Sequence, residues 1–133
     1  MNKELFARLR ELNLPPGKYA VFGSGQLGIR NLKECHDLDV IVAEDLWNEY
    51  RYKSDWKLLK MHHGSEFLER NGIELWKDWK PGQWNIEDLI QRAEIIDDLP
   101  FVTIDDVLKW KKLSGREKDL TDIKTLNNYL NVR

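Results

Sequence analysis

Apolar positions along the chain follow two periods, one typical of helices and one typical of strands. Near the amino terminus, helical spacing predicts an amphipathic helix over residues 3–13, which ends at Pro15-Pro16-Gly17. The run from Lys18 to Phe22 is apolar after its first residue and predicts a buried strand. Residues 37–42 begin with alternating acidic and apolar positions and predict a second strand.

The remaining elements alternate between helix and strand through the first two-thirds of the chain, and the end is helical. Thr103 and Asp106 have the spacing of a capping box, which marks the start of a helix. The last helix carries an apolar stripe from Leu120 to Leu130. We expect further helices over 25–33, 45–52, 86–92, 103–113 and 117–130, a strand over 73–76, a short strand or loop edge over 56–59, and a short extended segment over 93–96.

This order of elements predicts an α/β fold with a small sheet. The chain has 133 residues, which favours one domain over residues 1–133 with a single core. Its net charge of −2 disfavours broad, non-specific binding to nucleic acid. The chain has one cysteine and no apolar run of about 18 residues, so we expect a cytoplasmic protein without membrane segments.

A glycine-serine turn followed by paired acids is the most distinctive pattern in the chain. The first predicted strand ends at Gly23-Ser24-Gly25, and Asp37 and Asp39 follow one short helix later. Residues i and i+2 of a strand share a face, so the two carboxylates project together, about 7 Å apart along the chain. Such like charges are unfavourable unless a cation lies between them, and their hard oxygens suit Mg²⁺. The pattern therefore predicts a metal and phosphate site; solvated acids beside an ordinary turn are the alternative.

The segment from Gly23 to Gly28 also matches G-x-G-x-x-G, the dinucleotide-binding pattern, with Glu44 or Asp45 near the ribose-binding position. However, only about ten residues separate Gly28 from the next strand, which is short for a crossover helix. A second βαβ half is also not evident, and the paired aspartates have no role in this interpretation. We therefore rank dinucleotide binding below the metal and phosphate site.

The Gly23-Ser24 turn, the short helix and the Asp37-Leu38-Asp39 strand together resemble the nucleotidyltransferase superfamily. The resemblance extends from Tyr19 to Leu130 and is loose over 49–86. It implies a fold like that of DNA polymerase beta, with a mixed sheet flanked by helices over about 18–96 and carboxy-terminal helices over about 103–131. Segments near the end resemble the closing helices of small members, including toxin–antitoxin and resistance types: Asp105-Asp106-Val107-Leu108, Lys111, Gly115-Arg116, Lys118-Asp119 and Asp122-Ile123.

The resemblance implies a Mg²⁺-dependent (or Mn²⁺-dependent) nucleotidyltransferase. Such an enzyme moves a nucleoside monophosphate from a nucleoside triphosphate, with ATP the first choice, to an unidentified hydroxyl acceptor and releases pyrophosphate. Gly23 and Ser24 would hold the triphosphate, and Asp37 and Asp39 would bind the metal.

A third carboxylate is expected from a later strand. Glu74 is the first choice as a metal ligand and as a candidate base, and Asp78 replaces it if the register of the strand slips. A solvent-facing Glu74 is the alternative. Lys111 and Arg116 are the best cations for the triphosphate by family position, although a solvated helix face would also explain the basic run over 109–118. Acids in the last helix, Asp119 and Asp122, are expected to pair with these cations or to cap the helix.

A second hypothesis is a non-catalytic nucleotidyltransferase-like module, such as a partner-binding or antitoxin component. It would be favoured if Glu74 pointed away from the aspartates, or if an apolar surface around Trp79 and Trp84 were closed by another chain. We expect Trp76, by contrast, to lie in the core. The small size of the chain further implies that a homodimer or a protein partner completes the site.

Overall fold

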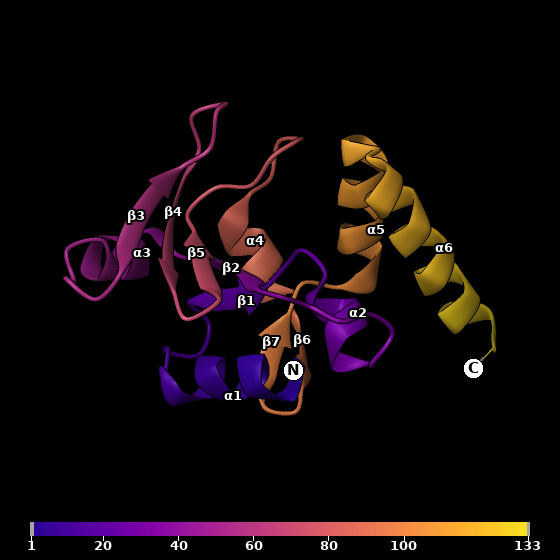
Figure 1. Ribbon diagram of the computed structural model, residues 1–133, viewed down its shortest axis with the longest axis horizontal. Helices are drawn as coiled ribbons and strands as arrows, with labels where there is room; N and C mark the ends of the chain where they lie inside the picture. Colours follow the sequence, from indigo (N-terminus) through magenta and orange to yellow (C-terminus); the bar gives the residue numbers. More distant parts are fainter. Residues whose placement is uncertain (1, 133) are drawn as a thin grey trace.

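A mixed sheet of seven strands forms the centre of the protein, with helices on both of its faces (Figure 1). The structure is a computed structural model and describes residues 2–132. In chain order the elements of this part are α1 (Asn2–Glu11), β1 (Tyr19–Val21), α2 (Gly25–Ile29), β2 (Leu38–Val42), α3 (Glu44–Tyr50), β3 (Lys57–Lys60), β4 (Glu66–Arg70), β5 (Ile73–Trp76), α4 (Ile86–Gln91), β6 (Glu94–Ile96), β7 (Leu99–Phe101), α5 (Ile104–Ser114) and α6 (Glu117–Val132).

The strand order across the sheet is β3-β4-β5-β2-β1-β7-β6, which places β2 in the middle. It runs antiparallel to β1 and parallel to β5. Alternate residues of β2 enter different cores: Val40 packs with α1 and α3 on one face, and Ile41 packs with α4 and α5 on the other. Both side chains are fully buried. A shift of β2 by one residue would exchange these faces, so the two cores fix its register.

Local capping signals set the ends of the carboxy-terminal helices. The hydroxyl of Thr103 accepts a hydrogen bond of 3.3 Å from the backbone N–H of Asp106, which confirms the capping box at the start of α5. Gly115 ends this helix with a φ of 62°, in the left-handed region that favours glycine. α6 then packs back against α5, and Figure 1 shows this pair to one side of the sheet.

The expected α/β class is confirmed, as are the helices, the strands that become β1, β2 and β5, the strand or loop edge at 56–59 that becomes β3, and the extended segment at 93–96 that becomes β6. The sheet is larger than predicted because β4 and β7 were not expected as strands. α2 ends at Ile29 and does not continue to residue 33. Asn31 follows with a φ of 57°, which no helix accommodates. None of the described helices is both long enough and apolar enough to cross a membrane.

Two further expectations are corrected by the packing. The dinucleotide-binding interpretation requires a parallel βαβ unit around Gly23–Gly28, whereas β1 and β2 pair antiparallel. The apolar stripe of α6 does not include Leu120, which is 59% exposed. Asp119 and Asp122 are buried on this helix instead, because cations from other elements pair with them.

Candidate functional site

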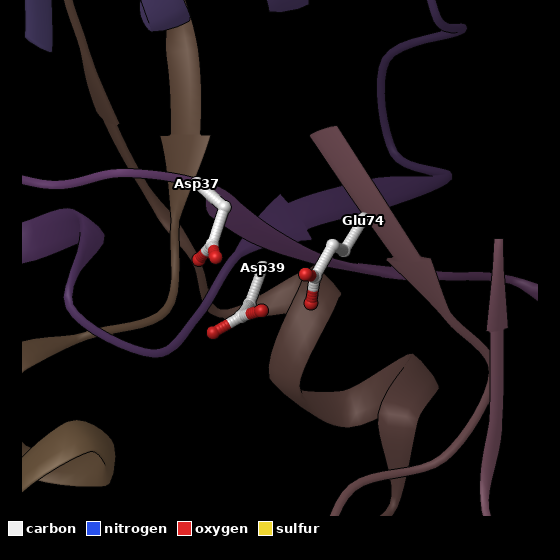
Figure 2. A group of neighbouring side chains, drawn as sticks. All are labelled: Asp37, Asp39 and Glu74. Carbon is white, nitrogen blue, oxygen red and sulfur yellow. The ribbon is translucent and has the colours of Figure 1, made fainter. Parts of the chain in front are cut away.

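Three acidic side chains form a cluster on one face of the sheet, and we refer to Asp37, Asp39 and Glu74 as the acid triad. Asp37 immediately precedes β2, Asp39 lies within it, and the parallel register of β2 and β5 pairs Asp39 with Glu74. Each residue offers one carboxylate oxygen, and these oxygens lie within 4.8 Å of one another. Figure 2 shows the three carboxyl groups pointing toward a common space. This arrangement could hold a divalent metal ion.

Burial and neighbouring like charges make ionisation of the acid triad unfavourable. Burial is the main factor that raises the pKa of Asp39, and the nearby charge of Asp37 adds to it. Burial also raises the pKa of Glu74 to about 9, together with the hydrogen bond and the charge of Asp39. Glu74 is thus protonated at neutral pH in the protein alone, and the raised pKa of Asp39 also opposes its ionisation. A bound cation would reverse this preference.

Gly23 borders the acid triad so closely that no side chain fits there. A Cβ atom on this residue would clash with the carboxyl group of Asp39. Its φ of 59° also lies in the left-handed region. The neighbouring Phe22 donates its backbone N–H to the carbonyl oxygen of Asp39 at 2.8 Å. The turn is therefore fastened to β2 next to the acids, as the spacing of the two motifs predicted.

Ser24, the next residue of the turn, lies against a second charged cluster. Its hydroxyl is 3.4 Å from Nζ of Lys33 and 3.5 Å from Nζ of Lys111. Both ammonium groups also donate to Asp122: Lys33 at 2.9 Å and 3.1 Å, and Lys111 at 2.9 Å. We refer to Lys33, Lys111, Arg116, Asp119 and Asp122 as the lysine–aspartate network.

The predicted phosphate cations take different positions in this network. Lys111 is 1% exposed, and its Nζ lies 3.5 Å from the Ser24 hydroxyl. Arg116 instead donates from Nε to Asp119 at 2.7 Å and from Nη2 at 3.1 Å. Arg116 also donates its backbone N–H to Asp119, which thereby caps α6. The expectation that the acids of the last helix pair with cations or cap the helix is confirmed.

The pKa values in the lysine–aspartate network shift in the opposite direction from those in the acid triad. Burial acts to raise the pKa of Asp119, but hydrogen bonds from Arg116 and Ser114 outweigh it and lower the pKa to about 2. Burial acts in the same way on Asp122, and the bonds from Lys111 and Lys33 lower its pKa below the usual range. Both aspartates therefore stay charged.

Two neighbours of the site were not expected from the sequence. Lys33 follows α2 in a loop, and no local pattern marks it as a ligand. Trp76 was expected in the core and is 9% exposed, but its indole N–H acts to lower the pKa of both Asp39 and Glu74. The N–H lies near these carboxyl groups without completing a hydrogen bond to a described residue. Trp76 is thus both a core residue and a neighbour of the acid triad.

The remaining candidates lie outside the acid triad. Asp78, the alternative third carboxylate, lies in the loop after β5, and its Oδ1 is buried without a hydrogen-bond partner in the described part of the chain. Trp79 is 7% exposed and stacks on Phe22 with 4.7 Å between ring centroids. Trp84 is half-buried and contacts the edge of the Phe22 ring. Both tryptophans therefore belong to the core or its margin.

No family model matches the chain, and no curated protein matches it either. The geometry of the acid triad and its neighbouring turn therefore has to support the choice of function.

Proposed function

We propose that the protein is a Mg²⁺-dependent or Mn²⁺-dependent nucleotidyltransferase with a fold like that of DNA polymerase beta. The observation that carries this proposal is the contact of the Gly23-Ser24 turn with the acid triad. The mixed sheet, the flanking helices and the closing α5–α6 pair fit the architecture that the sequence resemblance implies. The donor is a nucleoside triphosphate, with ATP the first choice, and the acceptor carries a hydroxyl group.

The donor set of the acid triad fits a hard divalent cation. Three carboxylates from adjacent strands supply oxygen ligands, and Mg²⁺ takes one or two such groups with phosphate oxygens and water. Asp37 is exposed, so the open side of the cluster faces solvent and can receive a substrate. When bound, the metal would neutralise charge on the attacking and leaving oxygens.

The residues around the turn have separate tasks in the transfer. Backbone amides at Gly23 and Ser24, with the Lys111 ammonium, hold the triphosphate. The acceptor oxygen forms a bond to the α-phosphorus, and the bond from that phosphorus to the bridging oxygen of the β-phosphate breaks. Pyrophosphate leaves with the electron pair of that bond. The proton of the acceptor hydroxyl passes to a carboxylate of the acid triad, with Glu74 the candidate base.

The features that would favour a non-catalytic module are not those of this molecule. Glu74 points toward Asp39 and not away from it (Figure 2). Trp79 is buried within the protein, so it does not offer an apolar surface for another chain. Both observations support the enzyme over the binding module.

The direct test is transfer from α-labelled nucleoside triphosphates in the presence of Mg²⁺ or Mn²⁺. We expect the wild-type protein to transfer label to a hydroxyl acceptor in a panel, and Asp39→Asn to lose both transfer and metal-dependent nucleotide binding. Glu49→Gln, which changes an exposed acid on α3, serves as the matched control and should keep both. Absence of transfer together with absence of metal–nucleotide binding in the wild type would overturn the proposal.

A further inference from the structure

We propose that Lys33 joins Lys111 at Ser24 to form a polyphosphate-binding site that works without a divalent cation. The inference rests on the proposed function, because it assigns the phosphate end of the same substrate. It adds a residue that neither the sequence pattern nor the resemblance singled out. It also divides the site into a metal-dependent half and a metal-independent half.

Two lysines from distant parts of the chain converge on one hydroxyl. Lys33 comes from the loop after α2, and Lys111 comes from α5. Their Nζ atoms lie 3.4 Å and 3.5 Å from the Ser24 hydroxyl. Convergence of two ammonium groups on one surface point is unfavourable unless an anion lies between them. Asp122 partly meets this need, since it accepts from both lysines.

The charges of the lysine–aspartate network do not cancel. Its cations are Lys33, Lys111 and Arg116, and its anions are Asp119 and Asp122, so three positive charges face two negative ones. Arg116 and Asp119 form a hydrogen-bonded pair of their own. The two lysines at Ser24 then share Asp122, with a longer contact of 3.7 Å from Lys111 to Asp119, so two ammonium groups border the Ser24 hydroxyl. A phosphate group is the anion that lysine ammonium groups commonly bind.

The two lysines differ in exposure, and this difference separates their roles. The side chain of Lys111 is 2% exposed and already donates to Asp122 at 2.9 Å, which satisfies the buried acid. The side chain of Lys33 is 33% exposed at the solvent end of the network. Asp122 accepts from both lysines, and of these two only Lys33 is also open to solvent. An anion from solvent would meet Lys33 first.

The turn places this cationic site directly beside the acid triad. Gly23 borders Asp39, and Ser24 borders the two lysines, so successive residues face opposite charges. One end of a polyphosphate can therefore bind at Ser24 while its other end reaches a cation in the acid triad.

Calorimetric titration with inorganic tripolyphosphate in EDTA tests the site without any divalent cation. We expect the wild type to bind, Lys33→Ala to bind about tenfold more weakly, and Lys33→Arg to keep most of the affinity. Lys112→Ala is the matched control, because it removes an exposed charge from α5, and it should bind like the wild type. In the wild type, the amide resonances of Gly23 and Ser24 should shift during the same titration.

Failure of the inference can be told from failure of the proposed function. If the wild type does not bind tripolyphosphate in EDTA, or if Lys33→Ala binds it as tightly as the wild type, the inference is overturned even when label transfer occurs. If binding depends on Lys33 but no transfer or metal–nucleotide binding is found, the inference stands and the transferase proposal falls. Circular dichroism confirms folding, and Lys33→Gln replaces Lys33→Ala if that variant is unfolded.

Discussion

The acid triad and the lysine–aspartate network lie on either side of the same turn, but the pKa values of their acids shift in opposite directions. In the acid triad, carboxylates face one another, and burial with like charge raises the pKa of Asp39 and Glu74. In the network, buried aspartates face cations, and the pKa of Asp119 and Asp122 falls. Burial acts alike on both sets, so the neighbours decide the direction of each shift.

Because of this difference, we interpret the acid triad as a ligand site and the lysine–aspartate network as a structural scaffold that holds the turn, α5 and α6 together. The network binds α5 to α6 and both to the turn, with most of its charge compensated internally. In the acid triad, Lys111 offsets the charge of Asp39 only in part, since the pKa of Asp39 is still raised, so a cation from outside would stabilise the carboxylates. A cluster that destabilises the protein alone and is relieved by a ligand is typical of a functional site. Substitutions in one cluster at a time test this difference.

We expect the largest change in the free energy of unfolding from a substitution in the lysine–aspartate network. Asp119→Asn removes a fully buried charge and leaves Arg116 and Lys111 without it. We expect the free energy of unfolding to fall by about 3 kcal/mol, because one partner of a buried ion pair is lost. Urea denaturation followed by circular dichroism measures this change. Lys118→Gln, at the exposed position before it, should change the value by less than about 0.5 kcal/mol; an equally small change for Asp119→Asn would show that the network is not structural.

Addition of metal should have nearly as large an effect, but through the acid triad. A ligand that binds only the folded state raises the free energy of unfolding by about 2.7 kcal/mol at a concentration one hundred times its dissociation constant. We expect Mn²⁺ to raise the melting temperature of the wild type relative to EDTA. Asp39→Asn should remove this increase. An equal increase in wild type and variant would place the metal elsewhere.

The pH dependence on the scaffold side follows from Asp119. Its pKa is about 2 in the protein against an ordinary value of 3.8, so its folded-state pKa is the lower one. Such a group contributes stability that is present above the unfolded-state pKa and is lost as the pH falls through the folded-state pKa. Between pH 3.8 and about 2, the wild type should lose stability faster than Asp119→Asn. Parallel denaturation curves of the two proteins over this range would contradict the assignment.

The fold was largely predictable because most elements carry their own apolar period. The segments that form β1, β2 and β5 each have an apolar face that can be recognised from the sequence of that segment alone. β4 and β7 were missed for physical reasons. In β4, charged residues flank a short apolar pair, and β7 contains Pro100, which disfavours a strand interior. Each of these strands is held by pairing with neighbours, which no local pattern encodes.

The site was predictable only where its residues lie close together in the sequence. Asp37 and Asp39 share a face because of strand geometry, and Gly23-Ser24 ends the preceding strand. The choice of Glu74 over Asp78 depended on the register of β5, which the pairing of Asp39 with Glu74 sets. Lys33 was missed because its partner Asp122 lies 89 residues further along the chain. The packing of α6 brings these two residues together, and no spacing pattern in the sequence predicts such a contact.

Glu74→Gln should reveal the strain in the acid triad. The substitution keeps the shape of the side chain and removes one of three neighbouring acids. In EDTA at neutral pH we expect it to stabilise the protein by about 1 kcal/mol, because Glu74, whose pKa is raised to about 9, must take up a proton on folding and a glutamine need not. Thermal denaturation measures the gain, and addition of Mn²⁺ should raise the melting temperature less than in the wild type. A loss of stability in EDTA would mean that the triad is not strained.

We expect the smallest change in the free energy of unfolding from Lys33→Ala. This variant tests whether Lys33 belongs to the structural part of the lysine–aspartate network. Asp122 keeps its bond from Lys111 at 2.9 Å when Lys33 is removed, and the Lys33 side chain is already 33% exposed. A pair that is open to solvent at one partner contributes little, so the free energy of unfolding should change by less than about 1 kcal/mol. Urea denaturation beside Asp119→Asn gives the comparison directly. A loss as large as that of Asp119→Asn would make Lys33 part of the scaffold, whereas a small loss leaves its charge available to a ligand at Ser24.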